Sequence, residues 1–210
     1  MYYIFLLLIQ IVYASIYSFS YPNINGLYDI IHYSENRYTV LSDPLYPNQM
    51  AYNILFYDYS YKTKNFYIVD NEGTLHTKNL DTQSYFKTQL EKYTYQINYI
   101  ENNSCFIGTI YKNNSLMFAL FNSYSGSIIK YFKPLEFNGR ALPLYGLSSV
   151  DNINNIFVAY FFDNMRIKII FYDLNNDKLL KIVNNKFSIY INIAYHYIDK
   201  KIIGIKYNRG

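Results

Sequence analysis

The sequence predicts an all-β fold built from repeated four-stranded units, and three observations lead to this prediction. The 210-residue chain is 51% hydrophobic, which is enough for a sizeable buried core. Beyond Tyr21, short runs of Ile, Tyr, Phe and Val alternate with Asn, Asp, Gly and Ser, as strands alternate with turns. No longer stretch carries an apolar stripe at helical spacing, and similar segments recur at intervals of 51 and 45 residues.

Composition excludes several classes of function. The 19 basic and 15 acidic residues leave a net charge of +4 without a basic block, so we expect no nucleic-acid partner. The single Cys105 excludes a disulfide scaffold and a zinc site built from cysteine pairs, and we expect no metal and no cofactor. The 28 tyrosines have two interpretations: a codon-biased genome, or exposed rings that stack on sugars or other flat ligands.

The first twenty residues carry no charged side chain and have an apolar core, which predicts a secretory signal peptide over 1–20. Val12 and Ala14 allow cleavage after Ala14, and Ser18 and Ser20 offer a second cut. The remaining residues, 21–210, are then one secreted domain. Two alternatives stay open: an uncleaved membrane anchor, which is the one case in which we expect contact with a membrane, and a first strand or helix of the fold.

Two N-glycosylation sequons agree with secretion. They begin at Asn102 and Asn113, and both fall where the pattern predicts a turn between strands.

The recurring segments are 105–114, 156–165 and 201–210. Each copy has a small residue that follows two apolar ones and an aromatic residue three positions later; the pairs are Gly108 and Tyr111, Ala159 and Phe162, and Gly204 and Tyr207. We expect the small residue to admit a neighbouring sheet and the aromatic to fill the wider space between sheets.

Placed in order, the strands form units at 54–87, 95–132 and 145–183 and a half unit at 189–207. Asp or Asn recurs before the later turn of each unit, in 80–84, at Asn122 and at Asp173, where it starts a hairpin by bonding its own backbone. Units of about 45 residues with four strands are typical of β-propeller blades. The sequence therefore predicts a propeller of about four blades, with a β-sandwich as the alternative.

The segment 66–84 carries a more specific pattern, in which Asp70, Gly73 and Asp81 follow apolar strands at turn positions and Gly126 occupies the last turn of the next unit. This pattern resembles the blades of quinoprotein-like and YWTD-like propellers. The resemblance implies the propeller fold. Because the chain has no Trp, neither the Trp contacts nor a quinone cofactor of those families is expected.

The half unit raises the question of ring closure. Residues 27–41 have the form of a hairpin, and we predict that they complete one composite blade with 189–207. The alternative is that the chain is a fragment or degraded copy of a longer propeller that stops within a blade.

Catalytic candidates are few. His32, His76 and His196 each alternate with apolar residues on an expected strand, so we predict structural roles for them, and Cys105 is expected to be a small buried side chain. Two long links, 42–53 and 133–145, belong to the side of a propeller that commonly holds ligands. The predicted ligand-binding residues are Asp43, Tyr46, Gln49, Glu136, Phe137, Asn138 and Arg140.

The sequence thus favours a secreted, non-catalytic binding module for an extracellular glycan or protein. A propeller hydrolase or lyase of the secretory pathway and an inactive truncated copy are the alternatives.

Overall fold

The computed structural model describes residues 16–19, 30–34, 37–41, 54–137, 141–163, 166–185, 190–196 and 198–206. All regular elements in these ranges are β-strands, which confirms the predicted all-β fold. The chain divides into two compact units, Met1–Ile54 and Leu55–Gly210. Within the described ranges, no helix has the length and apolar character needed to cross a membrane.

The first unit contains an antiparallel sheet of three strands in the order β1 (Ile16–Phe19), β2 (Ile30–Ser34) and β3 (Arg37–Leu41). The pairing of Ser34 with Arg37 confirms the hairpin expected within 27–41. Strand β1 falls inside the expected signal segment. Cleavage after Ala14 would leave this strand whole, whereas cleavage after Ser20 would remove it and expose one side of β2.

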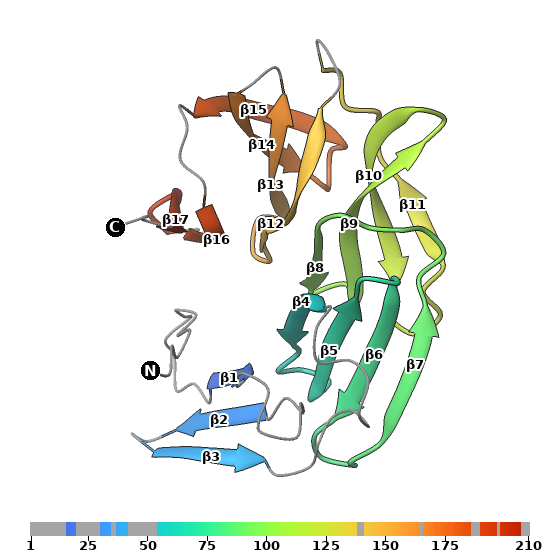
Figure 1. Cartoon of the computed structure of the whole chain (residues 1–210), viewed down its shortest axis with the longest axis vertical. Helices are drawn as coiled ribbons and strands as arrows, with labels where there is room; N and C mark the ends of the chain where they lie inside the picture. Colours follow the sequence, from blue (N-terminus) through green and yellow to red (C-terminus); the bar gives the residue numbers. More distant parts are fainter. Residues whose placement is uncertain are drawn as a thin grey trace. The chain divides into compact units, whose positions relative to one another are not determined.

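The second unit holds three antiparallel sheets of four strands, each in chain order (Figure 1). The first blade comprises β4 (Ile54–Tyr59), β5 (Asn65–Asp70), β6 (Thr74–Asn79) and β7 (Tyr85–Gln89). The second comprises β8 (Ile97–Ile100), β9 (Cys105–Lys112), β10 (Ser115–Asn122) and β11 (Ile128–Tyr131). The third comprises β12 (Leu142–Asp151), β13 (Ile156–Asp163), β14 (Arg166–Asp173) and β15 (Lys178–Asn185).

A fourth sheet pairs β16 (Tyr190–His196) with β17 (Lys201–Lys206). The three full units and the half unit predicted from the repeats therefore correspond to blades of four, four, four and two strands. The composite blade would join strands of the two units and stays a prediction, as does the 21–210 domain. Both sides of β2 are paired within its own sheet, so a composite blade would form through an outer strand, β1 or β3. If cleavage removed β1, the freed side of β2 could also pair.

Backbone geometry shows that the blades are repeats. The turn between the first and second strands ends in a left-handed residue in all four blades: Lys64, Ser104, Asn155 and Lys200. The turn between the third and fourth strands also contains a left-handed residue in each of the three full blades: Gln83, Gly126 and Asp177.

The predicted Asx residues start these later turns in the second and third blades, where Asn122 and Asp173 accept two backbone N–H bonds each. In the first blade, the alignment placed Asp81 at the start of the turn, and this is wrong. Asn79 starts the turn there and accepts the N–H groups of Asp81 and Thr82.

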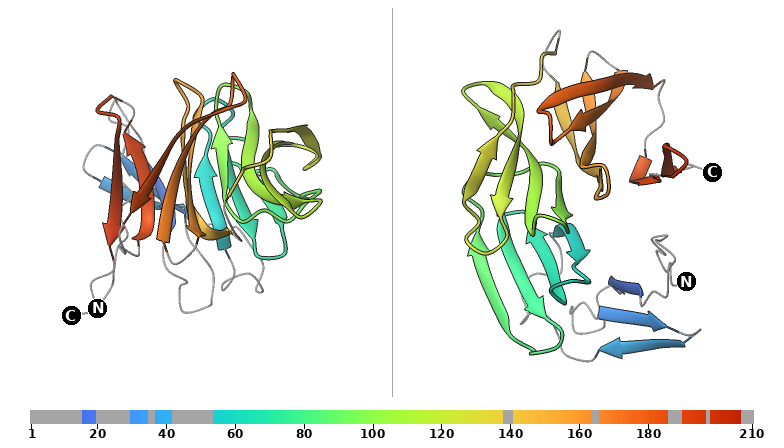
Figure 2. Two further views of the ribbon diagram at one scale, coloured as in Figure 1. Left: turned by 90° about the horizontal axis from the view of Figure 1, so that it is seen from above. Right: turned by 180° about the vertical axis from the view of Figure 1, so that it is seen from behind.

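The blades pack through aromatic side chains, and the second blade lies between the first and third (Figure 2). Tyr67 and Phe106 meet edge to face at 5.1 Å between the first two blades. Phe118 meets Phe157 at 4.9 Å between the second and third. Much of the Phe and Tyr content therefore serves packing, and Cys105 is buried among these side chains as expected, which raises the pKa of its thiol to about 11.

Position 108 must be a residue without a side chain, but for a different reason from the one expected. A Cβ at this position would lie 2.1 Å from the Thr94 methyl carbon and 3.1 Å from the Gln96 carbonyl oxygen. Residues 94–96 lead into β8 and pair with Thr109 of β9. The small residue thus admits a strand of its own blade and not a neighbouring sheet.

The turns between the first and second strands are hydrogen-bonded from blade to blade. The Lys62 N–H donates to the Glu101 carboxylate, and the Glu101 N–H donates to the Asn152 side-chain oxygen. The sequon residue Asn102 lies in this group of turns and donates to the Asn152 carbonyl at 2.5 Å, whereas Asn113 lies in an exposed two-residue turn with positive φ. Both sequons occupy turns, as predicted.

Asp58 on β4 is half-buried beside these turns, and its pKa is raised to about 7, mainly by burial and further by the charge of Glu101. The unfolded chain loses this proton near pH 4, so between about pH 4 and 7 the folded protein loses stability as pH rises. We therefore expect Asp58→Asn, which preserves the oxygen that accepts the Tyr59 N–H, to stabilise the protein by roughly 1 to 3 kcal/mol at pH 8 and little at pH 4.

Thermal unfolding at the two pH values measures this difference. Asp81→Asn, at an exposed position of the same blade, is the control and should show no pH-dependent gain. Equal effects of Asp58→Asn at pH 4 and pH 8 would contradict the assignment.

Candidate functional site

The candidate site lies on the side of the second unit where each blade connects to the next, which we call the link face. Because strands alternate in direction within each sheet, this face carries the links 90–96 and 132–141 together with the turns between second and third strands. Of the predicted ligand-binding residues, Glu136 and Phe137 belong here, and Asp43, Tyr46, Gln49, Asn138 and Arg140 lie outside the described residues.

The link 132–137 runs along the second blade and is held by backbone bonds. The Leu135 N–H donates to the Leu116 carbonyl at 2.8 Å. Phe137 is half-buried, with its ring 5.2 Å from that of Phe161, so it packs against the core as well as lining the face. Glu136 is exposed beside it.

Three tyrosines, Tyr93, Tyr95 and Tyr111, form what we call the tyrosine row. Tyr93 meets Tyr95 at 5.1 Å and Tyr95 meets Tyr111 at 5.6 Å, both nearly perpendicular. Tyr93 is 41% and Tyr111 is 36% exposed. The Tyr111 hydroxyl donates to the Ala141 carbonyl at 2.7 Å and so ties the row to the end of the link 132–141.

The sequence did not indicate the tyrosine row. The repeat pattern predicted Tyr111 in the space between sheets, whereas the structure places this ring at the rim of the link face. The available signal was the position of Tyr111 one residue before the end of β9, where a side chain reaches the edge of the sheet.

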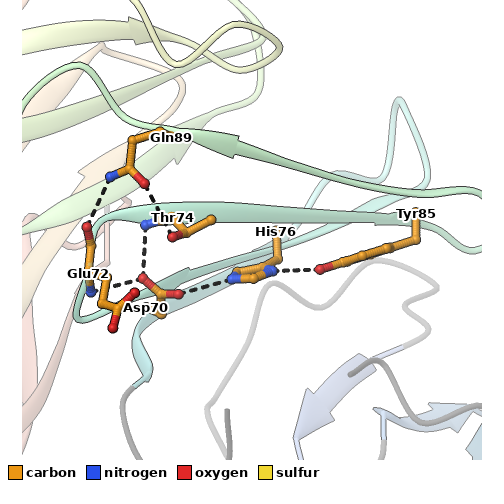
Figure 3. Close-up of polar contacts among 6 residues, drawn as sticks. All are labelled: Asp70, Glu72, Thr74, His76, Tyr85 and Gln89. Atoms are coloured by element: carbon orange, nitrogen blue, oxygen red, sulfur yellow. Dashed lines mark hydrogen bonds and ion pairs between the residues drawn. The ribbon is translucent and has the colours of Figure 1, made fainter. Parts of the chain in front are cut away.

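A buried polar network crosses the first blade and also was not expected (Figure 3). His76 is fully buried, with Nε2 3.1 Å from Asp70 Oδ2 and Nδ1 2.7 Å from the Tyr85 hydroxyl. Because an ionised carboxylate only accepts, Nε2 donates to Asp70, and in the neutral imidazole Nδ1 then accepts the Tyr85 proton. The three residues lie on adjacent strands at diagonal positions of one sheet face.

The network is completed at its acidic end by the turn after β5. Asp70 Oδ1 accepts the N–H groups of Glu72 and Thr74 at 2.9 and 2.8 Å, and Gln89 bonds Glu72 and Thr74 from β7. This geometry confirms Asp70 and Gly73 as turn residues, with Gly73 at φ 79°.

The chemistry of this network favours a structural role. Burial and the charge of Asp70 raise the pKa of Tyr85, so its hydroxyl stays protonated at neutral pH and serves as a hydrogen-bond donor rather than a nucleophile. His76 thus agrees with the predicted structural histidine, and His32 and His196 lie on strands β2 and β16 as expected. Within the described ranges, no three His, Cys, Asp or Glu residues are grouped to hold a metal ion.

Comparison with known proteins defines the fold and not the family. No family model matches the sequence, and no curated protein matches it. The chain is similar to one in the crystal structure of a nidogen/laminin complex, with a TM-score of 0.61 and 10% sequence identity over 87% of this chain and 67% of that one. That neighbour is a propeller structure, and at this identity the likeness shows the fold alone: the chain is a β-propeller-like protein.

Proposed function

We propose that this chain is a secreted, non-catalytic β-propeller module that binds another extracellular protein through its link face. The tyrosine row is the observation that carries this proposal. Tyrosine is enriched at the energetic centres of protein interfaces, because its ring buries a large apolar area while its hydroxyl forms hydrogen bonds. Edge-to-face contacts and the bond from Tyr111 to Ala141 hold the row in one arrangement, which lowers the entropy lost on binding.

The geometry of the row favours a protein over a glycan. A sugar ring stacks on a flat aromatic face, whereas neighbouring rings of the row stand nearly perpendicular to each other and form an uneven surface. The similar propeller in the nidogen/laminin complex belongs to a structure of a protein–protein complex, which supports the same choice. The uncharged first twenty residues and the two sequons on turns support secretion.

A screen of the secreted chain against purified extracellular proteins and a glycan array tests this function. We expect protein binding that weakens at least tenfold, or about 1.4 kcal/mol, in Tyr93→Ala and Tyr111→Ala. Tyr124→Ala is the matched control, because this tyrosine is 71% exposed on the turn between β10 and β11. Intact mass should show a chain that begins near Ser15 or Tyr21.

Tyr111→Phe separates the ring from the hydroxyl, and unchanged thermal unfolding shows that each variant is folded. Binding to glycans alone, or protein binding that row variants and the control weaken equally, would contradict the proposal. Retention of the N-terminal segment in a membrane fraction would contradict secretion.

A further inference from the structure

The side of the second unit opposite the link face carries two exposed apolar side chains beside a sequon. This side includes the turns between first and second strands, which we call the inner turns; in the first three blades they are residues 60–64, 101–104 and 152–155. Tyr61 is 53% exposed on the first inner turn, and Ile153 is 58% exposed on the third. Turns usually carry Gly, Pro, Asn, Asp or Ser at such positions, so two large apolar residues here call for an explanation.

Asn102, the first residue of a sequon, lies on the inner turn between these two. On one side, its Nδ2 donates to the Asn152 carbonyl oxygen at 2.5 Å, and Asn152 directly precedes Ile153. On the other side, the carboxylate of Glu101 accepts the N–H of the residue after Tyr61 at 2.7 Å. Asn102 is exposed, so a group attached to Nδ2 has room to extend into solvent. A sugar linked to this atom would begin between the two apolar side chains.

N-glycosylation attaches a sugar to this same nitrogen while the chain is still unfolded in the secretory pathway. The sugar donor is an oligosaccharide linked to a lipid pyrophosphate. A bond forms between Nδ2 and the anomeric carbon, the bond from that carbon to the pyrophosphate oxygen breaks, and the lipid pyrophosphate leaves while the amide gives up one proton. The modified amide keeps one N–H, so the hydrogen bond to the Asn152 carbonyl can form after modification.

We propose that Asn102 carries an N-glycan whose first sugar, an N-acetylhexosamine, covers Ile153 and Tyr61 and so stabilises the fold. The ring C–H groups and the acetyl methyl group of this sugar are apolar, and its hydroxyls stay in water, so the contact removes apolar surface from solvent without burying an unpaired polar group. Tyr61 packs edge to face on Tyr59 at 4.9 Å, which gives the sugar a fixed surface. The inference rests on secretion, one part of the proposed function, and does not involve the tyrosine row.

The second sequon provides the contrast. Asn113 and Asn114 form a two-residue hairpin turn between β9 and β10, at the end of a single blade rather than between the turns of neighbouring blades. We expect a glycan on Asn113 to extend into solvent and to contribute little to stability. The chain thus supplies a matched control for the glycan on Asn102.

Secretion of the full chain from cells that add N-glycans tests the proposal. Ser104→Ala and Ser115→Ala each remove one sequon and leave both asparagines in place, and intact mass should show one glycan less in each variant. We expect Ser104→Ala to lower the midpoint of thermal unfolding by about 2 to 4 °C and Ser115→Ala by less than about 1 °C. In the same chain made in bacteria, which carries no glycan, the two variants should have equally small effects. Trimming of the glycans to their first sugar should preserve the midpoint.

Ile153→Ser tests the contact itself and should reduce the loss caused by Ser104→Ala by at least half, because the sugar then covers less apolar surface. A secreted chain with a glycan on Asn113 and none on Asn102 would overturn this inference alone. Equal losses in the two serine variants, or a loss that Ile153→Ser leaves unchanged, would also overturn it. Retention of the chain in a membrane fraction with its N-terminal segment would overturn secretion and this inference together, whereas the tyrosine-row variants test the link face separately.

Discussion

Replacement of Gln96 by Leu is expected to lower the free energy of unfolding by roughly 3 kcal/mol or more. Gln96 is fully buried, and its Nε2 lies within 3.0 Å of three carbonyl oxygens of the third blade: those of Leu144, Leu147 and Tyr160. Its Oε1 accepts the Thr109 hydroxyl at 2.8 Å. One amide from the second blade thus serves three acceptors of the third.

These carbonyls depend on Gln96 because the pairing of β12 with β13 is interrupted between Pro143 and Ser148. A leucine has nearly the same size as Gln but donates no hydrogen bond, so it would leave the carbonyls buried and unsatisfied. Gln89→Leu is the matched control: Gln89 is exposed on β7, and we expect it to cost less than about 1 kcal/mol. Denaturant unfolding measures both variants, and equal losses would contradict the assigned role.

Gly126→Ala is expected to lower the free energy of unfolding by roughly 3 kcal/mol. Gly126 has φ 68°, and a Cβ there would lie 2.4 Å from the Gln89 carbonyl oxygen. The obstacle is backbone of the preceding blade, and the Gly126 carbonyl also accepts the Glu91 N–H. The methyl group would therefore push two blades apart.

Gly73→Ala separates backbone strain from collision. Gly73 has φ 79°, but its added Cβ would lie 3.3 Å from the flexible Gln89 side-chain nitrogen, so we expect a loss of about 1 kcal/mol. Gln83 and Asp177 occupy the position of Gly126 in the first and third blades with positive φ, which shows that the conformation alone tolerates a side chain. If both glycine variants lose equal stability by thermal or denaturant unfolding, the collision is not the cause.

The repeat was readable from the sequence because strand and turn signals are local. Cys105, Ile156 and Lys201 begin the second strands of three blades, as their aligned segments predict. Turn residues such as Asp70 and Asn122 bond backbone groups within four positions, so their role follows from nearby sequence. Asp81 was misassigned because Asn79 is also an Asx residue, and strand register decides which of them starts the turn.

The site was less predictable, because its residues come from segments that are distant in the sequence. Phe137 was expected on the link face and lies there, but its packing on Phe161 depends on the third blade. The separation of 16 residues between Tyr95 and Tyr111 carries no local signal of contact, and nothing near Gln96 in the chain indicates its three acceptors.

By itself, the sequence determined that the chain is all-β, that its strands come in repeated groups of four, and where the turns fall, since periodicity and turn chemistry act over a few residues. The tertiary structure alone decided which tyrosines share a face and which polar side chains join neighbouring blades. These contacts depend on strand register and on the approach of separate sheets, and a short hydrogen bond between blades leaves no pattern in either segment that forms it.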